Sequence, residues 1–200
     1  MNLNLIIMKK IAAFDVSSSN IGYSEFEIDN DIIKLVDIKN FSLDTDVEIY
    51  QRFDDFAKEM STKKFDYCIM EARLKSFFSG FSNKNAILSI AAANELASYI
   101  LNKYCTATIY KYHPNTWRKA AGFVLQRKVK VDIKTLVIEK TIVNEVFLEY
   151  LLCNKKEVKD IFPQRIISKG KNKGDAVYIT GVNDMADSFL LGIAGIKLAK

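Results

Sequence analysis

Four carboxylates at three places in the sequence could do chemistry together. Asp15 and Glu71 each end a short apolar run, and Asp184 and Asp187 open a long one. A carboxylate at the end of a buried strand is costly unless a positive charge meets it, and a divalent metal ion commonly supplies that charge. The pattern therefore predicts a metal-dependent enzyme.

The elements that must position these acids form an α/β pattern. An antiparallel meander is predicted first, because three strand-like runs follow one another with an Asp-Asn-Asp turn between the second and third. These strands are predicted at 9–16, 22–28 and 32–41. Parallel crossovers should follow, because helices then alternate with short apolar strands. These elements are predicted as helix 47–60, strand 65–71, helix 85–104 and strand 107–110.

Three further helices complete the predicted fold, which is a mixed five-stranded sheet flanked by helices. They are expected at 114–121, 130–152 and 183–198, the last with Asn183 as its N-cap. Between the last two, the Lys- and Gly-rich segment 155–181 is predicted to be a mobile basic loop.

This scaffold should bring the four acids together. Strand 9–16 and the strand that ends at Glu71 should be neighbours, so Asp15 and Glu71 should emerge side by side. Asp184 and Asp187 are three residues apart on a helix and so share a face. Oxygen ligands without nearby His or Cys favour Mg²⁺, with Mn²⁺ able to substitute. Two such ions roughly 4 Å apart would activate water and stabilise the leaving oxygen of a phosphodiester.

Structural explanations compete with this interpretation. Asp184 is explained equally well by helix capping and the helix dipole. Asp187 lies one turn further in, where capping does not reach, and a strand end such as Glu71 needs no acid for structure. Among the four acids, Glu71 and Asp187 therefore give the strongest support for a metal-binding role.

Length and composition limit the class of protein. With 200 residues, 49% of them hydrophobic, and no linker, the chain is predicted to be one domain spanning 1–200, in which 1–7 is a possible flexible extension. No run is long enough to cross a membrane and the start lacks a signal peptide. We expect a cytoplasmic protein, in a bacterium or an infected host cell, with no membrane partner. Reduced core thiols are expected at Cys68, Cys105 and Cys153.

Basic residues are concentrated in two stretches although the net charge is only +5. They lie at 118–134 and 155–173. Such clusters suit the phosphate backbone of a nucleic acid, and a solvated surface is the alternative.

Three short motifs occur in a characteristic order. They are Phe-Asp-Val-Ser-Ser-Ser-Asn-Ile-Gly-Tyr at 14–23, Ile-Met-Glu-Ala at 69–72 and Asn-Asp-Met-Ala-Asp-Ser-Phe-Leu-Leu-Gly at 183–192. In order and spacing the chain resembles the RuvC-like Holliday junction resolvases, which have a ribonuclease H-like fold. Within that resemblance, a strict resolvase and a phage or large-virus nuclease with looser substrate choice are equally open. The resemblance runs from about Met8 to the C-terminus.

The resemblance implies a site, a partner and an assembly. Asp15, Glu71, Asp184 and Asp187 would be the catalytic acids that hold two Mg²⁺ ions. The substrate would be branched DNA, first of all the four-way junction, and the enzyme would be a homodimer with one site in each subunit.

It also implies residues that bind DNA. The basic segment of the family would correspond to Arg118, Lys119, Lys128 and Lys130, with Lys128 facing the scissile phosphate. Trp117, in the same segment, is expected to anchor its helix to the core rather than stack on DNA.

A cluster of phenylalanines after Glu71 has two interpretations. Phe77, Phe78 and Phe81 lie where the family tends to place an aromatic side chain that stacks on an unpaired base. A core position is the ordinary alternative for each of them. Three Phe in a polar, Gly-containing stretch nevertheless indicate an exposed loop with a function.

Other functions stay open. A less selective debranching or flap endonuclease would use the same acids, and a catalytically silent branched-DNA-binding protein would use the basic loops alone. The actin-like and sugar-kinase ATPases share the core, but need two such halves and more glycine turns than a 200-residue chain with eight Gly offers.

Overall fold

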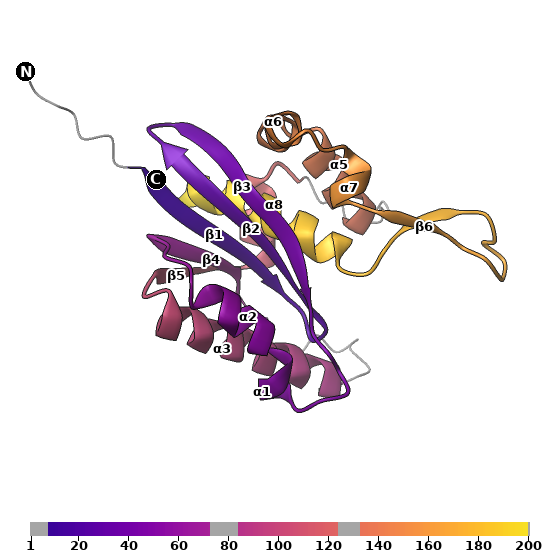
Figure 1. Ribbon diagram of the computed structural model, residues 1–200, viewed down its shortest axis with the longest axis horizontal. Helices are drawn as coiled ribbons and strands as arrows, with labels where there is room; N and C mark the ends of the chain where they lie inside the picture. The colour runs from indigo at the N-terminus through magenta and orange to yellow at the C-terminus, as the bar shows by residue number, and fades with distance from the viewer. Residues whose placement is uncertain (1–7, 73–83, 124–132, 200) are drawn as a thin grey trace, which may run out of the picture.

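The computed structural model describes residues 8–72, 84–123 and 133–199, so the predicted extension at 1–7 lies outside the described residues. Five strands form one mixed sheet in the order β3-β2-β1-β4-β5 (Figure 1). β1 pairs antiparallel with β2, and β2 with β3, whereas β1–β4 and β4–β5 are parallel. The strands are β1 (Lys9–Val16), β2 (Asn20–Asp29), β3 (Ile32–Ser42), β4 (Tyr67–Glu71) and β5 (Thr108–Tyr112). The predicted meander with added parallel strands is confirmed.

Helices cover both faces of the sheet (Figure 1). One face is covered by α1 (Ile49–Arg52), α2 (Asp54–Met60) and α3 (Lys84–Tyr104). The other is covered by α4 (Pro114–Ala120), α5 (Ile133–Ile142), α6 (Glu145–Asn154) and α8 (Val182–Leu198). Each face of the sheet has its own hydrophobic core, and successive side chains of β1 point alternately into the two. Ala13 packs beneath α8, and Phe14 packs on the opposite face.

Two predicted helices are each broken into two. The helix expected at 47–60 is interrupted at Phe53, which leaves the helical conformation at φ −98° and ψ 5° and is buried. The helix expected at 130–152 is interrupted before α6, where Asn144 takes an extended conformation and its side chain accepts a hydrogen bond from the Val146 amide at 3.0 Å. Tertiary burial and a local cap override the helical periodicity at these points.

The prediction of a loop over 155–181 is wrong in part. A short helix, α7 (Val158–Ile161), is followed by two paired strands, β6 (Gln164–Ile166) and β7 (Ala176–Tyr178). The Lys- and Gly-rich sequence is the turn of this hairpin. The N-cap prediction for Asn183 is also wrong, because α8 begins one residue earlier, with Gly181 at φ 90° as its N-cap.

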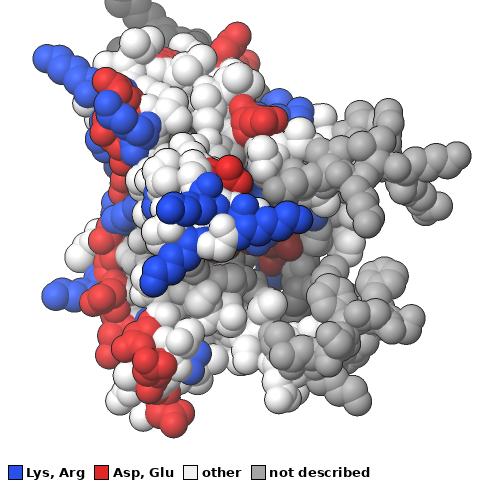
Figure 2. Space-filling view, turned by 90° about the vertical axis from the view of Figure 1, so that its right-hand side faces the viewer, with Lys and Arg blue, Asp and Glu red and all other residues white. Residues whose placement is uncertain are grey.

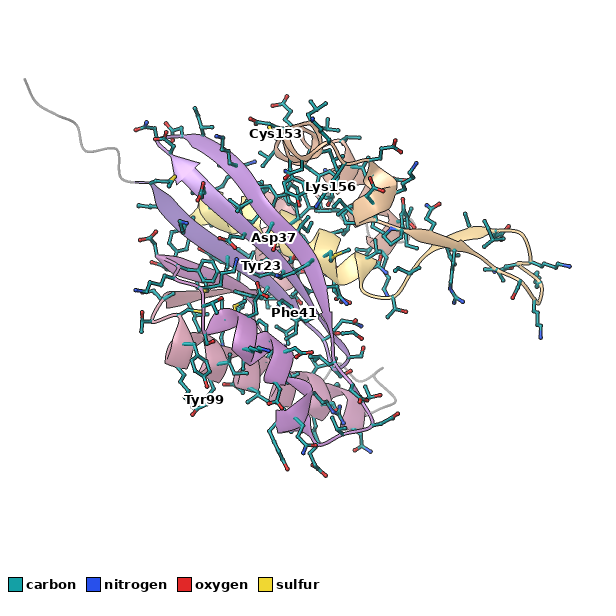
Figure 3. The ribbon with its side chains drawn as sticks, in the orientation of Figure 1. Tyr23, Asp37, Phe41, Tyr99, Cys153 and Lys156 are labelled. Carbon is teal, nitrogen blue, oxygen red and sulfur yellow. The ribbon has the colours of Figure 1, made fainter. Side chains whose placement is uncertain are left out.

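All three cysteines are free, but their environments differ. Cys68 and Cys105 are buried core thiols as predicted, whereas Cys153 is exposed on α6, where Figure 3 shows it on the outer side of the helix. The core prediction is therefore wrong for Cys153. In the part of the chain that the structure describes, no helix is long and apolar enough to span a membrane.

A network of charged groups attaches the end of α2 to the sheet. On β2, the Tyr23 hydroxyl donates a hydrogen bond to Glu25, whose carboxylate also contacts Lys63 Nζ at 2.7 Å. Lys39 on β3 lies 2.7 Å from Glu59 and 5.4 Å from the centre of the Tyr23 ring. Figure 3 shows Tyr23 together with its neighbours Asp37 and Phe41 on these strands. The network joins the end of α2 to β2 and β3.

Candidate active site

Two parallel strands place Asp15 and Glu71 at the same edge of the sheet. β1 and β4 are in register up to the pair Phe14–Met70, so the two acids follow at the ends of adjacent strands. Ala13 and Ile69, each two residues earlier, pack in the core beneath α8. Because side chains alternate along a strand, Asp15 and Glu71 lie on that same face.

A glycine allows α8 to bring the other two acids to this edge. Gly22 on β2 pairs with Asp15, and a Cβ built on Gly22 would lie 1.9 Å from the Asp184 carbonyl oxygen. A buried hydrogen bond of 2.8 Å between the hydroxyls of Ser24 and Ser188 holds the next turn of the helix on the same strand. The first turns of α8 therefore rest directly on the sheet beside Asp15.

The four carboxylates influence one another's ionisation. Burial raises the pKa of Asp15 well above its usual value, and the charges of Asp187, Glu71 and Asp184 raise it further. Burial also raises the pKa of Asp184, although Lys134 and a side-chain hydrogen bond from Asp15 oppose the rise. The acids from three distant segments thus lie close enough to repel one another.

Asp187 is a buried carboxylate that lacks a complete set of partners within the described ranges. Burial raises its pKa to about 7, with added effects of Glu71 and Asp184 and an opposing effect of Arg118. Its Oδ1 atom is buried and has no hydrogen-bond partner among the described residues. A buried carboxylate oxygen without a partner is unfavourable, and a bound cation would remove that cost.

Helix α4 supplies two groups that hold Glu71. His113 caps the helix, since its Nδ1 accepts a hydrogen bond from the Asn115 amide. Trp117 is 1% exposed, which confirms its predicted core position, and its Nε1 donates a hydrogen bond of 2.8 Å to Glu71 Oε2. The Arg118 guanidinium stacks on the Trp117 ring and lies 4.0 Å from the same carboxylate oxygen. Burial raises the pKa of Glu71, and these two neighbours limit the rise.

The donor set fits Mg²⁺ or Mn²⁺ held by pairs of carboxylates. No three acidic, histidine or cysteine side chains in the described ranges are arranged to hold one ion together. Mg²⁺ is commonly bound by only one or two carboxylates, with water and substrate phosphate oxygens as its other ligands. Asp15 with Asp184 makes one such pair, and Glu71 and Asp187 offer further carboxylate oxygens on the same face.

The residues predicted to bind DNA fall into three groups. Arg118 lies among the acids, where its charge lowers the pKa of Asp15, Glu71 and Asp187. Lys119 is exposed and lines an open hollow with Leu198, roughly 20 Å along α8 from Asp184 at 1.5 Å per residue. The others lie outside the described residues, and these are Phe77, Phe78, Phe81, Lys128 and Lys130.

The sequence interpretation missed two contributors to the site. One is the Trp117 hydrogen bond to Glu71, for which no local signal exists. The other is Lys134 at the start of α5, whose charge lowers the pKa of Asp184 and Asp187. Lys134 belongs to the basic stretch noted at 118–134, but its place beside the acids depends on the packing of α5 against α8.

Comparison with solved structures identifies the fold. The chain is similar to Thermus thermophilus RuvC in complex with a Holliday junction substrate, at 10% identity and a TM-score of 0.58, over 96% of this chain and 94% of that one. A second T. thermophilus RuvC structure matches at 11% identity and 0.55, over 95% and 96%. Fowlpox virus resolvase in complex with Holliday junction DNA matches at 17% identity and 0.50, over 95% and 98%.

No protein-family model and no curated protein matches the sequence. The likeness therefore lies in the fold, and it extends over nearly the whole of each chain. The predicted ribonuclease H-like fold, with its mixed five-stranded sheet, is confirmed.

Proposed function

We propose that the protein is a magnesium-dependent endonuclease that cleaves branched DNA, with the four-way junction as its first substrate. The observation that carries the proposal is the convergence of Asp15, Glu71, Asp184 and Asp187, from three distant segments, at one edge of the sheet. The fold supports it, since the RuvC and fowlpox virus proteins with this fold are described in complex with Holliday junction DNA.

Each residue of the site has a role in this proposal. Asp15 and Asp184 would hold one Mg²⁺, and Glu71 and Asp187 would complete the site for a second, with Mn²⁺ able to substitute. The ions would supply an activated water and charge stabilisation at the leaving oxygen of the phosphodiester. Trp117 and Arg118 keep the Glu71 carboxylate in position. Lys134 and Arg118 provide positive charge at the edge of the acidic group, where a phosphate would approach.

A homodimer would present two such sites to one junction. Symmetric dimers pair the same surface on both subunits. The outer face of α3 offers such a surface, because Leu88 and Tyr99 are 61% and 58% exposed and Ala92 lies on the same stripe. Figure 3 shows Tyr99 pointing away from the sheet. Residues 1–200 would form one nuclease domain that works in the bacterial cytoplasm or inside an infected cell.

A panel of labelled substrates tests the function. Four-way, three-way, flap and linear duplex DNA are incubated with the protein and Mg²⁺, with and without EDTA. The proposal predicts cleavage of the four-way junction that EDTA abolishes. Equal cleavage of flaps and three-way junctions would instead establish a general debranching nuclease, and binding without cleavage a silent DNA-binding protein.

A further inference from the structure

The β6–β7 hairpin projects from the body of the protein (Figure 1). Its strands pair antiparallel, with Gln164 opposite Tyr178 and Ile166 opposite Ala176. Backbone hydrogen bonds between Ile167 and Asp175 and from Gly174 to Ile167 extend the pairing toward the turn. The segment 164–178 is therefore an ordered hairpin.

In the part of the chain that is described, only the base of the hairpin contacts the core of the protein, through the half-buried Tyr178. Every residue in 164–178 is exposed or half-buried, and the two strands form a sheet of their own. A two-stranded hairpin buries too little apolar surface to be stable alone. We therefore expect the projecting hairpin to contact a partner molecule.

The charge of the hairpin indicates an anionic partner. Lys169, Lys171 and Lys173 form its tip, and Arg165 lies on β6, whereas Asp175 is the one acid in 164–178. Among the described residues, no ion pair includes a tip lysine. Figure 2, which views the protein from the side where the hairpin projects, shows Lys and Arg side chains gathered at the centre of that face. Closely spaced, uncompensated lysines suit the regular charges of a nucleic-acid backbone.

A short segment joins the base of the hairpin to α8, the helix that carries Asp184 and Asp187. The Ile179 amide donates to the Pro163 carbonyl at 3.1 Å and closes the base, and Asp184 follows Tyr178 by six residues. From Gln164 to the turn at Gly170 the strand reaches roughly 20 Å at 3.4 Å per residue. DNA bound at the acids would thus extend past the hairpin.

We propose that the β6–β7 hairpin binds the phosphate backbone of the duplex beside the cleavage site. The inference rests on the proposed function and deepens it. The hairpin adds affinity for DNA of any shape and does not recognise the branch, because lysines contact phosphates without reading base or junction geometry. Selectivity for branches must then reside elsewhere in the protein.

Two triple variants of the full-length protein with equal net charge test the inference. The tip variant carries Lys169→Ala, Lys171→Ala and Lys173→Ala. The matched control carries Lys9→Ala, Lys34→Ala and Lys58→Ala, three exposed lysines on other elements without ion pairs in the described structure. Kd is measured by fluorescence anisotropy in EDTA, on a four-way junction and a linear duplex, across a series of salt concentrations.

The tip variant should bind both DNAs more weakly at 0.15 M salt, by about 5-fold if one of its lysines neutralises a phosphate and about 100-fold if all three do. Its plot of log K against log salt should flatten by about 0.9 for each phosphate that the parent neutralises with a tip lysine, while the control keeps the parent slope. The ratio of junction to duplex affinity should not change. Cleavage of the four-way junction by the parent in Mg²⁺ tests the proposed function separately.

Unchanged affinity and salt slope in the tip variant, with parent cleavage intact, would overturn the hairpin inference and leave the proposed function standing. Weakening on the junction alone would overturn it too, because the hairpin would then recognise the branch. A parent that binds no DNA overturns both. If the tip variant fails to fold, a second variant in which Asn-Gly replaces residues 168–174 removes the tip and keeps a two-residue turn, and it must give the same reductions in affinity and salt slope.

Discussion

At the scale of single residues, the position of Glu71 depends on a donor that carries no charge. The Trp117 indole lies in the core and gives its one N–H to the Glu71 carboxylate at 2.8 Å. Groups that orient a metal ligand in this way typically contribute 10- to 100-fold to metal affinity or activity. Trp117 is thus a positioning residue of the proposed site.

The substitution Trp117→Phe tests this role, since it keeps an aromatic ring in the core and removes the donor. We expect Mg²⁺ affinity, measured by calorimetry on the full-length protein, and the cleavage rate to fall by about 10-fold or more. The melting temperature in EDTA should fall only slightly, because Phe fills most of the space that the Trp117 ring occupies. Unaltered metal affinity in a folded variant would show that Glu71 needs no such support.

The raised pKa values predict how stability depends on pH in the absence of metal. The pKa of Asp187 rises from 3.8 to about 7 on folding, so between these pH values the folded state binds more protons than the unfolded one. The free energy of unfolding in EDTA must therefore fall as pH rises from about 4 to about 7. Asp187→Asn should flatten this part of the profile and raise stability at pH 8.

Urea denaturation at pH 4.5, 6 and 8 measures the free energies of unfolding of the parent and of Asp187→Asn. Because the Asp187 charge also raises the pKa of Asp15, the comparison reports Asp187 together with its effect on Asp15. Parallel profiles for the parent and Asp187→Asn would contradict the assigned environment of this carboxylate.

At the scale of elements, the contact between α8 and β2 sets the geometry of the site. Gly22→Ala would place a methyl group 1.9 Å from the Asp184 carbonyl oxygen, so the first turn of α8 must move. Overpacking of this kind costs about 1–3 kcal/mol in stability. Cleavage should fall further than the loss of folded protein explains, because Asp184 moves with the helix.

Gly192→Ala is the matched control. Its Cβ would meet the Phe26 ring at 2.3 Å, in the same helix–sheet contact but five residues beyond Asp187, more than one turn from the acids. It should destabilise the protein comparably and leave the rate per folded molecule near that of the parent. Equal rates for the two variants, after correction for unfolded protein, would show that Gly22 has no part in placing Asp184.

The elements that the sequence predicts most accurately are those with a long, regularly spaced set of apolar residues. β1 is predicted with its observed bounds, and α3 within one residue, because each follows a long apolar pattern. The errors lie where local chemistry competes with periodicity, as at Phe53 and Asn144. The β6–β7 hairpin escaped prediction because its strands are three residues each, too short to alternate visibly beside a turn rich in Lys and Gly.

At the scale of the whole molecule, the site is a product of topology. The four acids were predictable because each interrupts or borders an apolar run, and their order follows a known pattern. Trp117 and Lys134 were not, because they reach the acids only when α4 and α5 pack against the sheet and α8. A single sequence contains no signal for contacts that arise between helices.

The central claim is that the four acids act together on DNA through bound metal ions. Its most direct test is the rate of Mg²⁺-dependent cleavage of a labelled four-way junction by Asp15→Asn, Glu71→Gln, Asp184→Asn and Asp187→Asn, with exposed Glu149→Gln as control. Each site variant should lose at least about 100-fold in rate, which is more than the loss of a group that only orients a metal ligand typically causes. Kd for the junction in EDTA should stay within about threefold of the parent value, because the carboxylate that is removed does not bind a phosphate. The control should cleave at the parent rate. Cleavage near the parent rate by two or more of the four site variants would contradict the account.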